Sequence, residues 1–155
     1  MKKLIAIILS LAAILAFAAC KNDSSDESKS PAKRLLDEFY ALDTSLSASD
    51  IAEKLSELDW LPFSGAYMPV EEGYLNGFTE QITGFDEGAV FSPSIGSIPF
   101  IGYVFKVSGG TEDFVDLLKA SYDLRWNVCT QADEMVCGAK GDTVVFVMSP
   151  ADFED

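Results

Sequence analysis

Four adjacent pairs of carboxylates are the side chains of this sequence with the most evident potential for chemistry. They are Glu71 with Glu72, Asp86 with Glu87, Glu112 with Asp113, and Asp133 with Glu134. Paired carboxylates can supply the acid and the base of glycoside hydrolysis, and carboxylate oxygens are preferred ligands of Ca²⁺. However, the pairs are scattered, none lies in a calcium-loop motif, and 25 acidic residues make chance pairs frequent. We therefore favour a solvated acidic surface, with a carboxylate-based hydrolase as an alternative.

The composition excludes several other classes of catalytic site. The chain contains no histidine, which excludes histidine bases, Ser–His or Cys–His nucleophile pairs, and histidine-ligated metals. Lys106 and Lys140 are conceivable bases, but a strand face and a turn explain them more simply. The formal net charge of −14 argues against binding to a phosphate backbone. We expect no enzymatic activity, no metal, no cofactor and no nucleic-acid partner.

Cys129 and Cys137 lie close together in the sequence. In an oxidising compartment they could form a disulfide, which would close a small loop and add about 2–3 kcal/mol of stability. The alternative is a pair of reduced thiols that pack as small apolar side chains. Because the spacing is not C-x-x-C, we do not expect a redox-active pair.

Two stretches are candidates for a contact surface. Residues 123–127 (DLRWN) place Arg125 beside Trp126, and these two residue types dominate the energetics of protein interfaces. The alternative is a helix C-terminus at which Arg125 complements the helix dipole and Trp126 enters the core. The second stretch, residues 92–99, presents Ile95 and Ile98 among small turn-forming residues, and it can equally be a plain hairpin connection.

Residues 67–85 interleave aromatic side chains with glycines. Such a segment could line a groove for a ligand. It could also fold over a sheet without binding anything, which is the interpretation that we favour. For residues 63–88 as a whole, we expect one part to form a loop and another part to form a short helix or strand.

The periodicity of the remaining residues predicts the elements that position these candidates. A helix is expected from Pro31, capped by Ser30, and a second one from Ser47 to about Trp60. A third helix is expected to begin at Thr111, which would act as its cap. Strands are predicted at 89–91, 100–107, 134–140 and 143–148.

These elements predict a single domain over residues 31–155. The fold class is α+β, with two N-terminal helices followed by a β-β-α-β-β unit that forms a small, mainly antiparallel sheet. Gly141 opens a two-residue hairpin turn, and residues 143–148 are apolar on both faces, as in a strand covered on each side.

The N-terminus resembles an export signal. Lys2 and Lys3 precede an uncharged run over residues 4–19, which is shorter than a membrane span and typical of a secretory signal. Phe17-Ala18-Ala19-Cys20 resembles the lipobox of bacterial lipoproteins. That resemblance implies that residues 1–19 are removed and that Cys20 becomes the lipidated first residue, although Phe17 departs from the leucine usual in this family.

The alternative is an ordinary signal peptide, cut after the A-x-A sequence at 16–18, which would release a soluble secreted protein. Residues 21–30 (KNDSSDESKS) carry no apolar side chain and are typical of a flexible tether behind the lipidated cysteine. Residues 20–30 would then link the domain, through a diacylglyceryl group, to the outer face of the cytoplasmic membrane. In a host with two membranes, the outer membrane is the other location, because Lys21 does not resemble the aspartate retention signal.

From residue 84 to residue 148 the chain resembles small uncharacterised lipoproteins of Gram-positive bacteria. The stretches that carry the resemblance are FSP at 91–93, IPF at 98–100, DLRWN at 123–127 and ADEM at 132–135. The resemblance implies an exported α+β domain and no reaction. We expect a non-enzymatic surface domain that binds an unknown envelope protein or cell-wall ligand. A small-ligand carrier and a cell-wall hydrolase are the alternatives.

Overall fold

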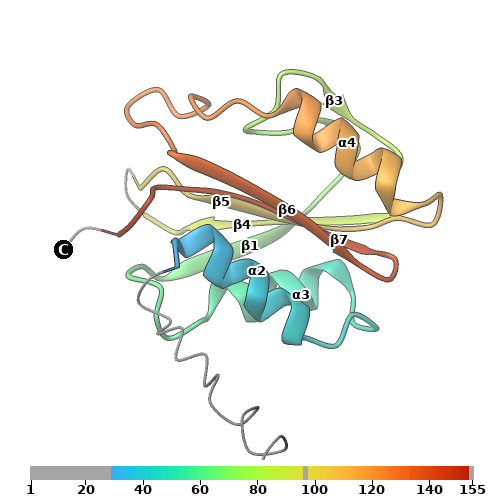
Figure 1. Cartoon of the computed structure of the whole chain (residues 1–155), viewed down its shortest axis with the longest axis horizontal. Coiled ribbons are helices and arrows are strands. Elements are labelled where there is room, and N and C mark those ends of the chain that lie inside the picture. Colours follow the sequence, from blue (N-terminus) through green and yellow to red (C-terminus); the bar gives the residue numbers. More distant parts are fainter. Residues whose placement is uncertain (1–28, 96–97, 154–155) are drawn as a thin grey trace, which may run out of the picture.

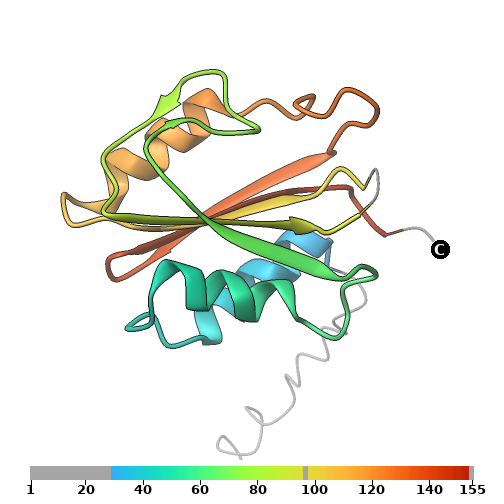
Figure 2. The ribbon, with the colours of Figure 1, turned by 180° about the vertical axis from the view of Figure 1, so that it is seen from behind.

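The computed structural model describes residues 29–95 and 98–153, so the predicted leader, Cys20 and most of the predicted tether lie outside the described residues. The predicted α+β class is confirmed. A five-stranded sheet lies between two layers, as Figures 1 and 2 show from opposite sides. Helices α2 (Pro31–Ala41) and α3 (Ala48–Ser56) cover one face, and α4 (Thr111–Ser121) lies on the other.

All neighbouring strands of the sheet are antiparallel, and their order is β1-β4-β5-β7-β6. The strands are β1 (Gly65–Val70), β4 (Glu87–Pro93), β5 (Ile101–Lys106), β6 (Glu134–Lys140) and β7 (Thr143–Ser149). A separate antiparallel pair, β2 (Gly73–Tyr74) and β3 (Gln81–Ile82), lies on the side of α4. The mainly antiparallel sheet is confirmed, whereas the sequence pattern did not locate β1, β2 and β3.

Strand β7 is the most buried element, since all seven of its residues are buried. Val145 and Val147 pack in the cluster beneath α2 and α3, whereas Val144, Phe146 and Met148 pack in the cluster beneath α4. The prediction of a strand covered on both faces is therefore confirmed. Because its side chains enter both clusters, β7 links the two halves of the core. Burial of each such side chain contributes about 1.5–3 kcal/mol to the stability of the fold.

The turn between β6 and β7 fits its sequence. Gly141 adopts φ = 63°, a left-handed value that glycine tolerates without strain. Beside this turn, the ammonium of Lys140 donates to the carbonyl oxygens of Tyr40 and Leu42, at 2.8 and 2.7 Å. Lys106 donates to the carbonyl oxygen of Thr44 and lies 3.2 Å from the carboxylate of Asp142. Both lysines thus hold the α2–α3 connection, which is a structural role.

Two predicted helix boundaries are wrong. Helix α3 ends at Ser56 rather than near Trp60, where the hydroxyl of Ser56 donates to the carbonyl oxygen of Glu53. The following residues then make a turn, closed by the bond from the amide of Leu61 to the carbonyl oxygen of Leu58. The cap of α4 is Gly110, and Thr111 is already helical.

The caps of the first two helices differ. Ser30 occupies the cap position of α2, but its hydroxyl makes no capping bond and is buried without a partner. In α3, the hydroxyl of Ser47 accepts from the amide of Asp50 at 3.1 Å, as the sequence predicts.

Gly102 tests how tightly the sheet packs against α2 and α3. A Cβ atom built on Gly102 would lie 2.1 Å from the ring of Phe91, which is itself fully buried. We expect Gly102→Ala to lower the free energy of unfolding by about 1–3 kcal/mol, because the ring has to move within a packed core. Urea denaturation measures this change.

Gly109→Ala is the matched control. Gly109 has no heavy atom within 4 Å of its virtual Cβ and no positive φ, so its replacement should leave the stability within about 1 kcal/mol of the wild type. Equal stability of the two variants would contradict the packing described for Phe91.

Candidate contact surface

Two connections meet at one end of the sheet, the end at which α2 begins (Figures 1 and 2). One joins β4 to β5 and contains Ile95 and Ile98, and the other joins α4 to β6 and contains Arg125 and Trp126. The structure therefore places all four predicted contact residues at the same end. We call Ile95, Ile98, Arg125, Trp126 and Val128 the loop-end surface.

The members of this surface differ in exposure. Ile95 is 90% exposed and Val128 is 99% exposed, although both side chains are aliphatic. Ile98 is half-buried against the cluster beneath α2 and α3, and Trp126 is half-buried against the cluster beneath α4. Trp126 is thus partly a core residue, whereas the two aliphatic tips contact solvent. Sequence reasoning missed Val128, whose only signal is an aliphatic residue within a polar loop.

Arg125 lies on a loop with its own hydrogen bonds. Its amide donates to the carboxylate of Asp123 at 2.8 Å, and its Nε donates to the side-chain oxygen of Gln131 at 3.0 Å. Helix α4 ends at Ser121, and Lys119 is the basic residue of its last turn. Arg125 therefore lies beyond the helix, with its side chain exposed.

A groove of about 590 Å³ lies beside Ile98. Its walls are largely apolar and include Phe153, which contacts the ring of Phe63 at a centroid distance of 5.7 Å. The charged side chains that line it are Asp133 and Asp152. Its volume falls within the range of small-molecule sites, and its charge would favour a cationic ligand.

Four carboxylates of the predicted acidic pairs each accept a hydrogen bond from a backbone amide. In each of three pairs, one carboxylate accepts a hydrogen bond from the backbone amide of another segment. Glu72 accepts from Gly84, Asp86 from Ser108, and Asp133 from Ala151. Glu87 does the same for Ala48, in the first turn of α3. These carboxylates hold loops and a helix start in place. Within residues 29–95 and 98–153, no three His, Cys, Asp or Glu side chains are grouped as metal ligands.

The two cysteines occupy different environments. Cys129 is exposed in the α4–β6 connection, and Cys137 is half-buried in β6, where it lines a hollow of about 470 Å³ with Tyr40 and Lys119. Both thiols are free in the structure, and the disulfide stays a prediction. Burial raises the pKa of the Cys137 thiol to about 12, which keeps it protonated and unreactive at neutral pH.

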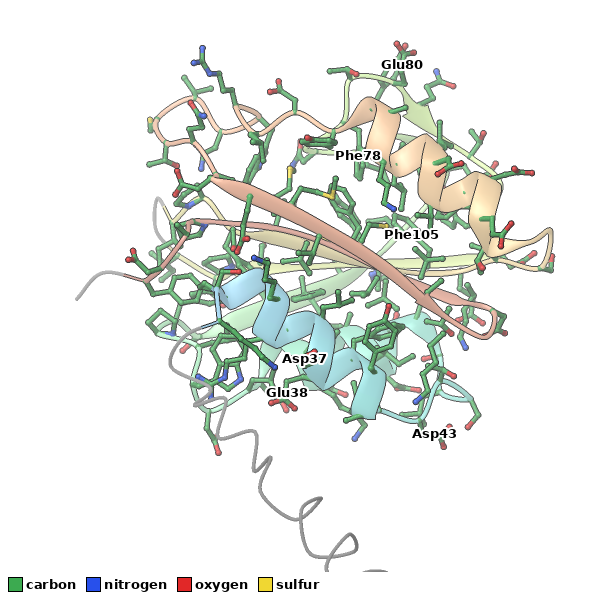
Figure 3. The ribbon with its side chains drawn as sticks, viewed as in Figure 1. Asp37, Glu38, Asp43, Phe78, Glu80 and Phe105 are labelled. Carbon is green, nitrogen blue, oxygen red and sulfur yellow. The ribbon has the colours of Figure 1, made fainter. Side chains whose placement is uncertain are left out.

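The aromatic and glycine-rich segment folds over the sheet. Phe78 packs against Tyr103 and Phe146, and Figure 3 shows Phe78 and Phe105 between α4 and the sheet. The hydroxyl of Tyr103 donates to the carbonyl oxygen of Asn76 at 2.8 Å. Phe78 and Phe85 thus pack against the core, whereas Tyr67 and Tyr74 of the same segment are exposed.

No helix among the described residues is long and apolar enough to cross a bilayer. Comparisons with models of protein families, with curated proteins and with solved structures find no match. The function has therefore to be argued from the residues of this chain.

The state of the cysteines gives a direct test. In a Cys20→Ala variant, which carries two thiols, we expect alkylation of the native protein to add one group first, at Cys129, because Cys137 is half-buried and protonated. Unfolding in denaturant should expose the second thiol, and intact mass spectrometry counts both. If neither thiol reacts until a reductant is added, the predicted disulfide exists and the free thiols of the structure are wrong.

The buried thiol also predicts a dependence of stability on pH. Burial raises the pKa of Cys137 from 9.0 to about 12, so the folded protein holds this proton more tightly than the unfolded chain. The resulting contribution to the free energy of unfolding is complete below pH 9.0 and is lost as the pH rises toward about 12. Burial also raises the pKa of Tyr103, which acts in the same direction. Urea denaturation across this pH range should show that the free energy of unfolding falls less steeply with pH for Cys137→Ala than for the wild type. Cys129→Ala is the control and should keep the wild-type slope.

Proposed function

We propose that this chain is a lipid-anchored, non-enzymatic binding domain of the bacterial cell envelope. The observation that carries the proposal is the loop-end surface, where Ile95 and Val128 are almost fully exposed beside the end from which α2 enters the domain. Removing exposed aliphatic side chains from water stabilises a complex with the partner that covers them. An exposed arginine, Arg125, adds a group that is frequent at interfaces.

The anchor in this proposal is Cys20. A signal over residues 1–19 directs export, and a diacylglyceryl group on Cys20 holds the protein at the outer face of the cytoplasmic membrane, or at an outer membrane where the host has one. Two acyl chains retain a protein at a bilayer far better than one. Residues 20–30 form the tether, and residues 31–155 form the binding domain, which is exported and acidic.

In this proposal, the order of the elements brings the two contact loops to one end of the sheet. Two N-terminal helices precede the sheet, and the β4-β5-α4-β6-β7 unit places both contact loops at the same end. The partner would be an envelope protein or a cell-wall ligand that meets Ile95 and Ile98 from one loop and Arg125 and Trp126 from the other. Because Trp126 and Ile98 also pack on the core, they would fix the shape of the loops.

A small-ligand carrier is the second candidate, and the groove of about 590 Å³ favours it. The ligand would be a small cation with an apolar part, since Asp133 and Asp152 face apolar walls. A ligand that binds only the folded protein raises its melting temperature, so a thermal-shift screen of such cations tests this candidate. A cell-wall hydrolase is the least supported, and release of soluble products from purified cell wall would establish it.

Crosslinking and affinity capture of the protein from its own cells test the leading proposal. We expect partner recovery with the anchored protein, and a decrease of about tenfold or more for the double variant Ile95→Ala with Arg125→Ala, because truncated hot-spot residues cost about 2 kcal/mol. Tyr74→Ala, at another exposed site, should keep the recovery. Unchanged recovery with the double variant would show that this site assignment is wrong.

Cys20→Ala is the control for the anchor. It should move the protein from the membrane fraction to the soluble fraction. A Cys20→Ala protein that stays with the membrane would contradict lipidation.

A further inference from the structure

We infer that the loop-end surface rests on the lipid bilayer itself, with Ile95 and Val128 inserted among the headgroups and the first methylenes. This inference rests on the proposed anchor, and it assigns the bilayer to that surface in place of the protein or cell-wall partner proposed above.

The segments that carry the exposed tips lack carboxylates although the chain is strongly acidic, and Asp123 and Asp133 flank the second of these segments. Of the 25 acidic residues, none lies between Gly88 and Thr111, and none lies between Leu124 and Ala132. The first range includes Ile95, and the second includes Arg125 and Val128. Carboxylates are costly to desolvate and are repelled by anionic lipids, so their absence is what a bilayer contact requires.

The opposite end of the sheet carries adjacent pairs of carboxylates. There the β1–β2 turn carries Glu71 and Glu72, and the start of α4 carries Glu112 and Asp113. Figure 3 shows Asp43 in the α2–α3 connection, at that end. An anionic membrane surface would repel these paired carboxylates. The loop end also carries carboxylates, at Glu57 and Asp59 in the α3–β1 connection and at Asp152, so charge favours a contact by the loop tips alone.

The length of the tether imposes the same orientation. Covalent geometry limits the span from Cys20 to Lys29 to about 30 Å. Since α2 begins at the loop end, the anchor keeps that end within about 30 Å of the bilayer. A tethered group has a high effective concentration at its target, so even a weak contact by two aliphatic tips is populated.

The form of the surface favours a bilayer over a protein or a second copy. Ile95 and Val128 are single aliphatic residues at the tips of separate loops, each almost fully exposed, whereas protein interfaces are built from large contiguous patches. Two copies with a formal charge of −14 each repel one another. Asp133 and Asp152 line the adjacent groove and limit the contact to the loop tips.

Cys129 is a native probe of this contact, because it follows Val128 and is exposed, whereas Cys137 is half-buried and its raised pKa keeps it protonated. The experiment places the reduced, lipidated full-length protein in vesicles of phosphatidylcholine, with and without phosphatidylglycerol, and follows alkylation by a membrane-impermeant maleimide. We expect Cys129 to react at least tenfold more slowly in the anchored protein than in soluble Cys20→Ala. Ile95→Asp with Val128→Asp should restore the fast reaction without releasing the protein from the vesicles.

A second thiol position controls for crowding at the vesicle surface. Ser45→Cys in a Cys129→Ser background places the thiol in the α2–α3 connection at the far end, and this thiol should react equally fast with and without the anchor.

Three results would overturn the inference, and they are distinguishable. If the protein floats with the vesicles while Cys129 reacts as fast as in Cys20→Ala, the anchor holds and the bilayer contact is wrong. If Cys129 is protected in native membranes but not in pure lipid vesicles, a protein covers the surface instead. If the wild-type protein from its own cells carries no lipid, the proposed anchor fails and the inference fails with it.

Discussion

The burial of β7 on both faces is the constraint on which the rest of the structure depends. All seven of its residues are buried, so a layer is needed above and a layer below. Helices α2 and α3 supply one of them, and α4 with the segment that contains Phe78 supplies the other. Because β7 pairs with β5 on one side and with β6 on the other, it joins the central strand of the sheet to the edge strand that follows the α4–β6 connection.

The two ends of the sheet are stabilised by different interactions. At the hairpin end, Lys106 and Lys140 donate to carbonyl oxygens of the α2–α3 connection. Such charge-assisted bonds contribute about 1.5–3 kcal/mol each, and Lys140 supplies a cation at the carbonyl end of α2, which has no basic residue in its own last turn. At the loop end, aromatic packing among Phe63, Phe100 and Phe153 replaces these bonds.

Part of this arrangement could be predicted from the sequence, because some signals are local. The double-faced apolar pattern of β7 and the glycine-first turn at Gly141 each depend on neighbouring residues alone. Strand β1 lacks such a signal, since four of its six residues are exposed and it contains Pro69, a residue type that is rare in strands. Strands β2 and β3 are two residues long, and the segment between them is held by a distant partner through the bond from Tyr103 to Asn76. Non-local bonds of this kind leave no periodicity in the sequence.

The candidate surface could be predicted only in part, for a related reason. Residue type identified Arg125 and Trp126, but it could not show that Trp126 packs half-buried while Val128 is exposed, since that depends on how the α4–β6 connection crosses the core. The connection is fixed by the bond from the amide of Ala132 to the carbonyl oxygen of Leu124 and by Trp126 beneath it. The core therefore determines the shape of the loop, while the residues at its tip contribute little to folding. A single exposed aliphatic side chain is ordinary on a protein surface, so the case for a contact outside the domain depends on the exposure of Ile95 and Val128 at the same end of the sheet.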